Sequence, residues 1–263
     1  MPGNFPIDEE SSDLTFVYWY SLQDTLLVMD QNSAELQAIF KPIFVSLLEI
    51  FVIKLNLPDN YDEWSDEEKE RLRCYRIDIG DTLVYMIGII GDVMLEFVIN
   101  RLIQAVNEQQ QNRIRWRLPD YFKQSATDND FVLVDNWKIQ EALIYMMQSV
   151  VSELNESCSP DFTNVNDSNL IAFMDVLPRI SYANKHILST TLLAVGSLGS
   201  WLEVHQDVLP NAISLCLLGL KTESVTQSAS FALKDIINDC DLSSFGEQIL
   251  STCQVSVSFI FFK

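Results

Sequence analysis

Turn-forming residues are scarce in this sequence. Eight glycines and eight prolines occur among 263 residues, about half of the combined share of roughly 12% that is usual in proteins. An all-β sandwich or barrel needs more turn residues than this, and so does a glycine-rich nucleotide-binding fold. Hydrophobic residues make up 48% of the chain and charged residues 21%, which is typical of a folded protein rather than a disordered one. The composition therefore favours a helical fold.

Residues that carry catalysis or hold metals are also few. Two histidines are present, His186 and His205, and no Asp, Glu or Cys is spaced around them to complete a zinc site. The sequence has no glycine-rich phosphate loop and no nucleophile or metalloprotease motif. We therefore expect no enzyme activity, no cofactor and no bound metal.

The five cysteines contain no C-x-x-C pair, and no N-terminal signal peptide is evident. This pattern indicates reduced structural thiols in the cytosol or nucleus. The longest apolar stretch, Leu83 to Ile99, is interrupted by Asp92 and Glu96, so no membrane span of 18 residues is expected. These features are typical of a soluble intracellular protein.

Basic residues are outnumbered, since 17 Lys and Arg face 37 Asp and Glu, a net charge of −20. A field of this sign repels nucleic acid and anionic lipid and attracts basic partners. The same charge could also serve only to keep an exposed helical surface in solution.

Apolar residues recur every three or four positions along most of the chain, which is typical of amphipathic helices. Ser65 and Glu68 form a capping-box pattern at one helix start, and Gly91-Asp92 separates that helix from the next. Gly196 and Gly199 are expected to allow close helix packing. The pattern predicts five helical pairs in one array, at residues 11–56, 65–109, 137–180, 184–220 and 222–252, with an irregular tail at 254–263.

The helix pairs begin at intervals near those of HEAT and armadillo repeats, which run about 40–47 residues. Each pair would leave an apolar face bare unless its neighbour stacked on it. The sequence thus predicts an all-α solenoid, or superhelix, of HEAT/armadillo-like helical hairpins.

An acidic loop precedes the second pair, and an aromatic residue, Trp64, lies within it. Such a loop can bind a basic partner segment through charge-assisted hydrogen bonds and stacking. The alternative is a solvated connection before a helix N-terminus, where acids are favourable in any case. The candidate partner-binding residues of this acidic loop are Asp59, Asp62, Glu63, Trp64, Asp66, Glu67 and Glu70.

A basic-aromatic cluster lies in the polar connector that runs from Glu108 to Asp130. Its candidate binding residues are Arg113, Arg115 and Trp116, followed by Arg117. The arginines could meet an acidic protein patch, or they could pair with acidic neighbours in their own chain. Three arginines in a field of −20 make a weak case for nucleic acid.

Several ordered blocks resemble the importin-β, or karyopherin-β, superfamily, and together they cover roughly residues 3 to 250. These blocks are Leu14–Asp24 (LTFVYWYSLQD), Lys69–Met86, Trp137–Val150, Leu192–Leu220 and Ala229–Cys240. The resemblance implies a nuclear transport receptor built from HEAT repeats, present in cytoplasm and nucleus. It further implies protein cargo with basic patches on the inner face, contacts with phenylalanine-glycine nucleoporins, and Ran in its GTP form as a partner.

Receptors of this superfamily are several times longer than this chain, which resembles a central block of their repeats. The resemblance therefore places most Ran contacts outside this chain and indicates a partial or alternatively ended gene product. The competing interpretation is a HEAT-type scaffold for protein–protein interaction that is independent of Ran.

Overall fold

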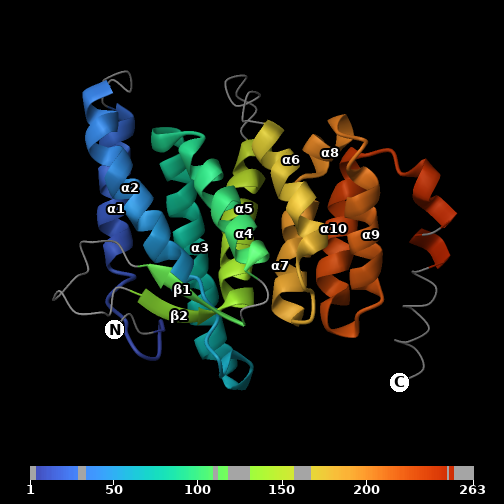
Figure 1. Ribbon diagram of the computed structural model, residues 1–263, viewed down its shortest axis with the longest axis horizontal. Coiled ribbons are helices and arrows are strands. Elements are labelled where there is room, and N and C mark those ends of the chain that lie inside the picture. Colours follow the sequence, from blue (N-terminus) through green and yellow to red (C-terminus); the bar gives the residue numbers. More distant parts are fainter. Residues whose placement is uncertain are drawn as a thin grey trace. The chain divides into compact units, whose positions relative to one another are not determined.

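Helices make up nearly all of the regular structure in the computed structural model of this chain (Figure 1). The structure describes residues 4–28, 34–108, 112–117, 131–156, 167–247 and 249–251. The chain forms two compact units, unit 1 at residues 1–150 and unit 2 at residues 151–263. The expected tail at 254–263 lies outside the described residues.

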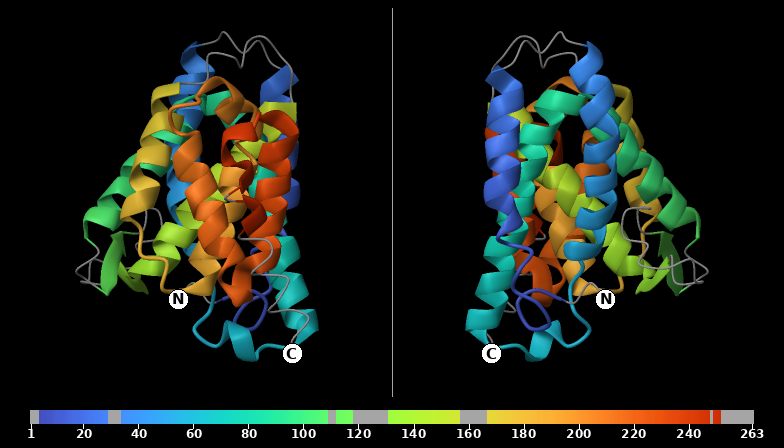
Figure 2. Two further views of the ribbon diagram at one scale, coloured as in Figure 1. Left: turned by 90° about the vertical axis from the view of Figure 1, so that its right-hand side faces the viewer. Right: turned by 90° about the vertical axis from the view of Figure 1, so that its left-hand side faces the viewer.

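Unit 1 contains two successive helix pairs and the start of a third. Its elements are α1 (Thr15–Val28), α2 (Ala34–Lys54), α3 (Asp66–Ile90), α4 (Val93–Asn107), β1 (Arg113–Arg117), β2 (Phe131–Asp135) and α5 (Asn136–Glu156), which runs past the end of the unit. In the right-hand view of Figure 2, α1 and α3 lie on one side of this unit and α2 and α4 on the other. Helix α2 begins ahead of Pro42 and continues through it, so that proline does not delay the helix start.

Local sequence sets both ends of α3. The Ser65 side chain accepts a hydrogen bond from the Glu68 backbone N–H at 3.2 Å, and Glu68 Oε2 accepts from the Ser65 N–H at 2.8 Å, which confirms the predicted capping box. At the other end Gly91 adopts φ +58°, a left-handed conformation that glycine takes without steric cost. The predicted corner before α4 is therefore confirmed.

No single described helix is long and apolar enough to cross a membrane. Helices α3 and α4 meet the length and composition criteria only when taken together, and they are bent by 119° at the Gly91 corner.

Large apolar side chains from successive helices fill the core of unit 1. Phe44 of α2, Ile79 and Leu83 of α3, and Met94 and Leu102 of α4 are fully buried. At roughly 25 cal/mol per Å² of apolar surface, such burial is the main term that holds these short pairs together.

The connector between α4 and α5 contains two strands, which the sequence analysis did not predict. Strands β1 and β2 pair antiparallel, with Ile114 opposite Val134 and Arg115 opposite Leu133. Ile114, Trp116 and Val134 are buried while Arg113, Arg115 and Leu133 are exposed. This alternation is typical of a strand with one buried face. Both ends of the connector are therefore regular strand.

Unit 2 carries shorter helices. Its elements are α6 (Asp167–Val176), a 3₁₀ turn (Leu177–Arg179), α7 (Lys185–Gly196), α8 (Gly199–Val204), α9 (Leu209–Leu220), a 3₁₀ turn (Glu223–Val225), α10 (Thr226–Asp239) and a last 3₁₀ turn (Ser243–Phe245). Helices α7, α9 and α10 pack on one another. The sequence pattern predicted one helical pair at residues 184–220, but the structure forms three helices there, α7, α8 and α9.

Small residues allow the close packing of unit 2. A Cβ on Gly196 would lie 2.7 Å from the Ala232 Cα of α10, and a Cβ on Gly199 would lie 3.2 Å from the Asp235 carbonyl oxygen. Both distances are too short for any larger side chain without movement. The predicted role of these glycines in close helix packing is confirmed.

Candidate partner-binding site

The acidic loop is a short, ordered connection between α2 and α3. A 3₁₀ turn at Tyr61–Glu63 leads into the Ser65 cap. Lys69 donates to the Asp62 carbonyl oxygen at 3.1 Å and lies 5.9 Å from the centre of the Tyr61 ring. The loop therefore holds its shape through contacts with its own helix.

Trp64 anchors this loop and does not offer a stacking surface. Its side chain is buried, at 8% exposure, and its Nε1–H donates to Asn60 Oδ1 at 3.2 Å. The Tyr61 ring centre lies 5.9 Å away. The expectation that Trp64 could stack on a partner is corrected by this burial, since the indole contributes to the unit's own packing.

Two of the candidate carboxylates are engaged inside the chain. Asp59 pairs with Lys138 at the start of α5, and this hydrogen bond lowers the pKa of the Asp59 carboxyl. Glu70 receives two hydrogen bonds from Arg73, at 2.7 and 2.6 Å, which lower the pKa of Glu70. These two carboxylates are less available to a partner than their exposure suggests.

The remaining carboxylates of the loop face solvent. Asp62, Glu63, Asp66 and Glu67 are exposed, and within the described part of the chain the side chains of Glu63, Asp66 and Glu67 have no hydrogen-bonding or ionic partner. Asp66 and Glu67 also lie in the first turn of α3, where the helix dipole favours negative charge. The loop thus presents three free carboxylates at one helix start.

The basic-aromatic cluster forms strand β1 of the β1–β2 hairpin, and its tryptophan, like Trp64, is buried. Trp116 is 5% exposed, and its Nε1–H donates to the Glu49 carbonyl oxygen of α2 at 3.1 Å. The Arg101 guanidinium of α4 lies 5.0 Å from the centre of this ring and pairs with Glu49. Trp116 therefore fixes the hairpin to α2 and α4, and a role in direct stacking on a partner is corrected.

The two clusters that the sequence suggested separately approach each other at Asp59. Arg113 pairs with Asp135 across the hairpin at 3.0 Å. After the larger effect of Lys138, Arg113 is a further charge that lowers the pKa of Asp59. Arg113 thus follows the intramolecular alternative left open by the sequence, whereas Arg115 is exposed on the hairpin.

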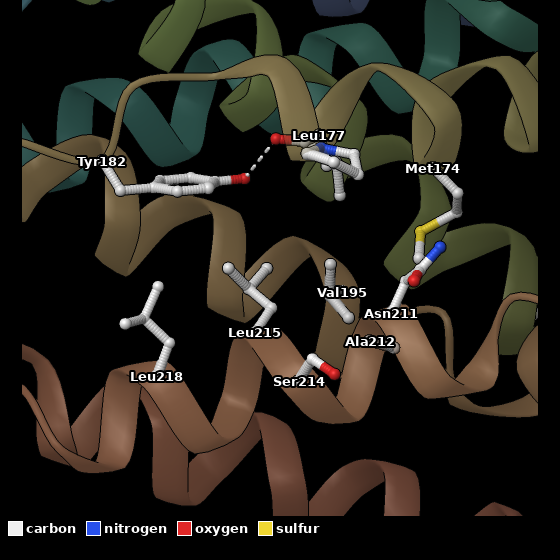
Figure 3. Close-up of a pocket in the computed structure, with 10 residues that line it drawn as sticks. Met174, Leu177, Tyr182, Val195, Asn211, Ala212, Ser214, Leu215 and Leu218 are labelled. Atoms are coloured by element: carbon white, nitrogen blue, oxygen red, sulfur yellow. Dashed lines mark hydrogen bonds between the residues drawn. The ribbon is translucent and has the colours of Figure 1, made fainter.

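An apolar pocket in unit 2 was not predicted from the sequence. It has a volume of about 230 Å³ and lies between the end of α6, α7 and α9 (Figure 3). Tyr182 borders it and donates to the Leu177 carbonyl oxygen at 2.9 Å. Burial raises the pKa of the Tyr182 hydroxyl. The other lining residues are Met174, Leu177, Pro178, Val195, Asn211, Ala212, Ser214, Leu215 and Leu218. Leu215 and Leu218, one turn apart on α9, were a sequence signal for it.

Among the described residues, no group of three or more His, Cys, Asp or Glu side chains is placed to hold a metal ion. His205 instead stacks on Trp201, with ring centres 4.0 Å apart. Its Nδ1 lies 3.0 Å from the Trp201 carbonyl oxygen.

Comparison with known proteins places this geometry in a family context. Residues 57–92, which include the acidic loop and all of α3, match the family model described as the importin 13 repeat. Importin-13 of Gallus gallus is 28% identical over 260 residues, and importin-13 of Homo sapiens is 27% identical over the same length. Each alignment covers 97% of this chain and 24% of the relative.

More distant and structural relatives agree. Transportin MOS14 of Arabidopsis thaliana is 22% identical over 249 residues, covering 87% of this chain and 22% of that protein. A solved structure, importin 13 in its cytosolic state, superimposes with a TM-score of 0.78 and 28% identity, over 98% of this chain and 27% of the other. The resemblance to the importin-β superfamily is confirmed.

From the sequence blocks we predicted the greatest likeness within that superfamily to importin 13, with transportin 3 next, and the importin-13 matches agree with the first part of this prediction. The predicted fold class, an all-α solenoid of helical hairpins, is confirmed by the match to the importin 13 structure. The relatives reported above are importins and a transportin, which agrees with the expectation of no enzyme activity. The chain spans about a quarter of the length of the curated relatives it matches.

Proposed function

We propose that this importin-13-like chain acts in nucleocytoplasmic transport as a nuclear transport receptor, or as a segment of one. In this proposal it binds protein cargo and Ran in its GTP form, and it is present in cytoplasm and nucleus. The observation that carries the proposal is the similarity to importin-13 along 97% of the chain, together with the structural match over 98% of it.

The proposal includes one continuous HEAT-like array in which α4 and α6 line the cargo side. Each repeat of a solenoid contacts mainly its neighbours, so small changes at successive interfaces add up to a large change in curvature. One ligand can in this way alter the surface offered to another. No nucleic acid and no membrane is needed as a partner.

The acidic loop supports a basic partner, either cargo or the basic surface of Ran. Free carboxylates at Glu63, Asp66 and Glu67 can accept charge-assisted hydrogen bonds from Lys or Arg. The apolar pocket of unit 2 supports the further proposal of contacts with phenylalanine-glycine nucleoporins, because its volume of about 230 Å³ suits an aromatic side chain.

The first test is binding of the purified chain to Ran loaded with a non-hydrolysable GTP analogue, beside Ran loaded with GDP. A preference for the GTP form supports the receptor. Equal or absent binding, together with constitutive capture of a protein partner, supports instead the Ran-independent HEAT scaffold.

A second test addresses the acidic loop. Reversing Asp62, Glu63 and Glu67 to Lys is expected to weaken a basic partner by roughly tenfold and to reduce the salt dependence of binding. The matched control reverses three exposed acids of unit 2, Glu203, Asp207 and Glu247, and gives the same net charge. If both triple variants bind alike, the loop is only a solvated connection.

A further inference from the structure

Arginines in this acidic chain mostly pair with carboxylates. Arg71, Arg73, Arg76, Arg101 and Arg113 each form an ion pair with a glutamate or aspartate. Arg115 differs, because its side chain is exposed and has no hydrogen-bonding or ionic partner in the described residues. Acids outnumber bases 37 to 17 in the sequence, yet within the described residues this guanidinium has no carboxylate partner, so it can pair with a carboxylate from outside them.

The hairpin fixes the place from which Arg115 projects. Its two neighbours in β1, Ile114 and Trp116, are buried on the opposite face, and the Trp116 hydrogen bond to α2 holds the strand. Leu133 lies directly across from Arg115 and is 51% exposed. A cationic and an apolar side chain therefore stand next to each other on one outward face.

Extended backbone is the natural complement of this face. The sheet has two strands in the described structure, so each has an edge without a strand beside it, and a strand edge can pair with an extended peptide. Side chains on one face of a strand repeat about every 7 Å. A ligand strand with acidic residues at alternate positions would present carboxylates at the same spacing as the hairpin.

We propose that the outward face of the β1–β2 hairpin, formed by Arg115 and Leu133, binds an extended acidic segment of a partner protein. The Arg115 guanidinium forms a bidentate pair with a carboxylate of the segment, and Leu133 covers an apolar side chain beside it. This site is separate from the acidic loop, takes a ligand of opposite charge, and does not depend on the proposed transport function.

Charge favours a short acidic peptide over nucleic acid as the occupant. A net charge of −20 opposes any anion, but screening limits this repulsion to about 8 Å at physiological salt. A peptide needs only one or two carboxylates at the hairpin. A nucleic acid carries a phosphate at every nucleotide, most of which would face the acidic surface without a cation.

The test uses the whole purified chain and fluorescence anisotropy with a labelled eight-residue peptide of alternating Glu and Val. A peptide of alternating Lys and Val and a ten-residue oligouridine are the comparison ligands. Variant Arg115→Glu is paired with Arg179→Glu, an exposed arginine of unit 2 that gives the same change of charge. Arg115→Lys and Leu133→Ser complete the set.

We expect Arg115→Glu to lower the affinity for the Glu-Val peptide at least tenfold. Arg179→Glu should change this affinity less than twofold. Arg115→Lys should give an intermediate loss, because it keeps the charge without the bidentate geometry. Leu133→Ser should weaken binding about threefold. Thermal unfolding should be unchanged in Arg115→Glu, and if it is not, Arg115→Lys and Leu133→Ser still decide the question.

Equal effects of Arg115→Glu and Arg179→Glu would overturn the site, since only the overall charge would then matter. Binding of oligouridine in preference to the Glu-Val peptide, lost in Arg115→Glu, would overturn the acidic peptide in favour of nucleic acid. Binding of the Glu-Val peptide that is unaffected by Arg115→Glu would overturn it as well.

Discussion

Units 1 and 2 share the same helical design but are held together differently. Unit 1 adds charged and aromatic contacts to its apolar core, such as the pair of Arg76 and Glu141 at 2.7 Å and the ring of Phe5, ahead of α1, stacked on Tyr75 of α3 at 4.4 Å. Unit 2 brings α7, α9 and α10 together through small residues, with Gly196 against Ala232. The comparison teaches that one solenoid design tolerates both polar and close-packed interfaces, and that each has its own weak point.

The largest expected effect is on the buried ion pair of unit 1. The side chains of Arg76 and Glu141 are 9% and 2% exposed, and the Arg76 guanidinium also lies 4.2 Å from the Tyr145 ring centre. Glu141→Gln leaves a buried charge without its counter-ion, so we expect a loss of about 3 kcal/mol in the free energy of unfolding. Urea unfolding measures this loss.

Hydrogen exchange locates the loss of stability in Glu141→Gln, since faster amide exchange should appear in α3 and α5 and not in α10. The control is Glu70→Gln, which breaks the exposed pair with Arg73 and should leave the free energy of unfolding nearly unchanged. A similar cost for both variants would mean that burial of the ion pair does not matter.

A smaller effect is expected in unit 2 from one added methyl group. Gly196→Ala forces α7 away from the α10 backbone, because the new Cβ would lie 2.7 Å from the Ala232 Cα. Overpacking costs about 1–3 kcal/mol. The better helix propensity of alanine offsets this cost by up to about 1 kcal/mol. We expect a net loss of about 1.5 kcal/mol, measured by thermal unfolding.

Gly246→Ala is the matched control, because nothing lies within 4 Å of a Cβ at Gly246. It should leave the stability unchanged or raise it slightly. If Gly196→Ala is as stable as this control, the small-residue interface of unit 2 is not close-packed in solution.

The smallest effect concerns pH and should appear in unit 1. Burial raises the pKa of Glu9, but hydrogen bonds from Lys54 and Ser12 outweigh it and lower this pKa from 4.5 to about 2. A carboxyl with a lowered pKa in the folded state adds stability above about pH 4.5, and this stability is lost between pH 4.5 and pH 2. Glu9→Gln should therefore cost about 1 kcal/mol at pH 7 and nothing at pH 2.

Urea unfolding at pH 7, 4 and 2 checks the expected convergence. Glu10→Gln is the control, because the pair of Glu10 with Arg71 is largely exposed and should contribute little at any of these pH values. A cost of Glu9→Gln that stays constant with pH would assign the effect to packing rather than to charge.

Local signals explain how much of the fold could be predicted from the sequence. The Ser65 capping box and the Gly91 corner depend on a few adjacent residues, so their geometry is readable directly. The break between α7 and α8 was missed because Leu198 and Leu202 are buried and continue the apolar stripe across it.

The hairpin was missed for a different reason. Arg113 to Arg117 alternates basic and apolar residues, which is a strand pattern, but five residues within a polar connector were interpreted by their charge. For the candidate site, exposure of the carboxylates followed from residue type, whereas the burial of Trp64 and Trp116 depends on hydrogen-bond acceptors, Asn60 Oδ1 and the Glu49 carbonyl, that the sequence pattern does not reveal.

Because of the hairpin, the position at which α5 begins does not depend on the length of the chain between α4 and α5. The Asn136 N–H donates to the Asn112 carbonyl oxygen at 2.9 Å, so the chain returns to α5 at the place where it left α4. Lengthening a loop whose ends are held together costs little, about 0.6 kcal/mol of loop-closure entropy for each doubling of its length. The pairing that runs from Arg113 opposite Asp135 to Arg117 opposite Phe131 thus fixes where α5 begins, whatever the number of residues that join the two strands.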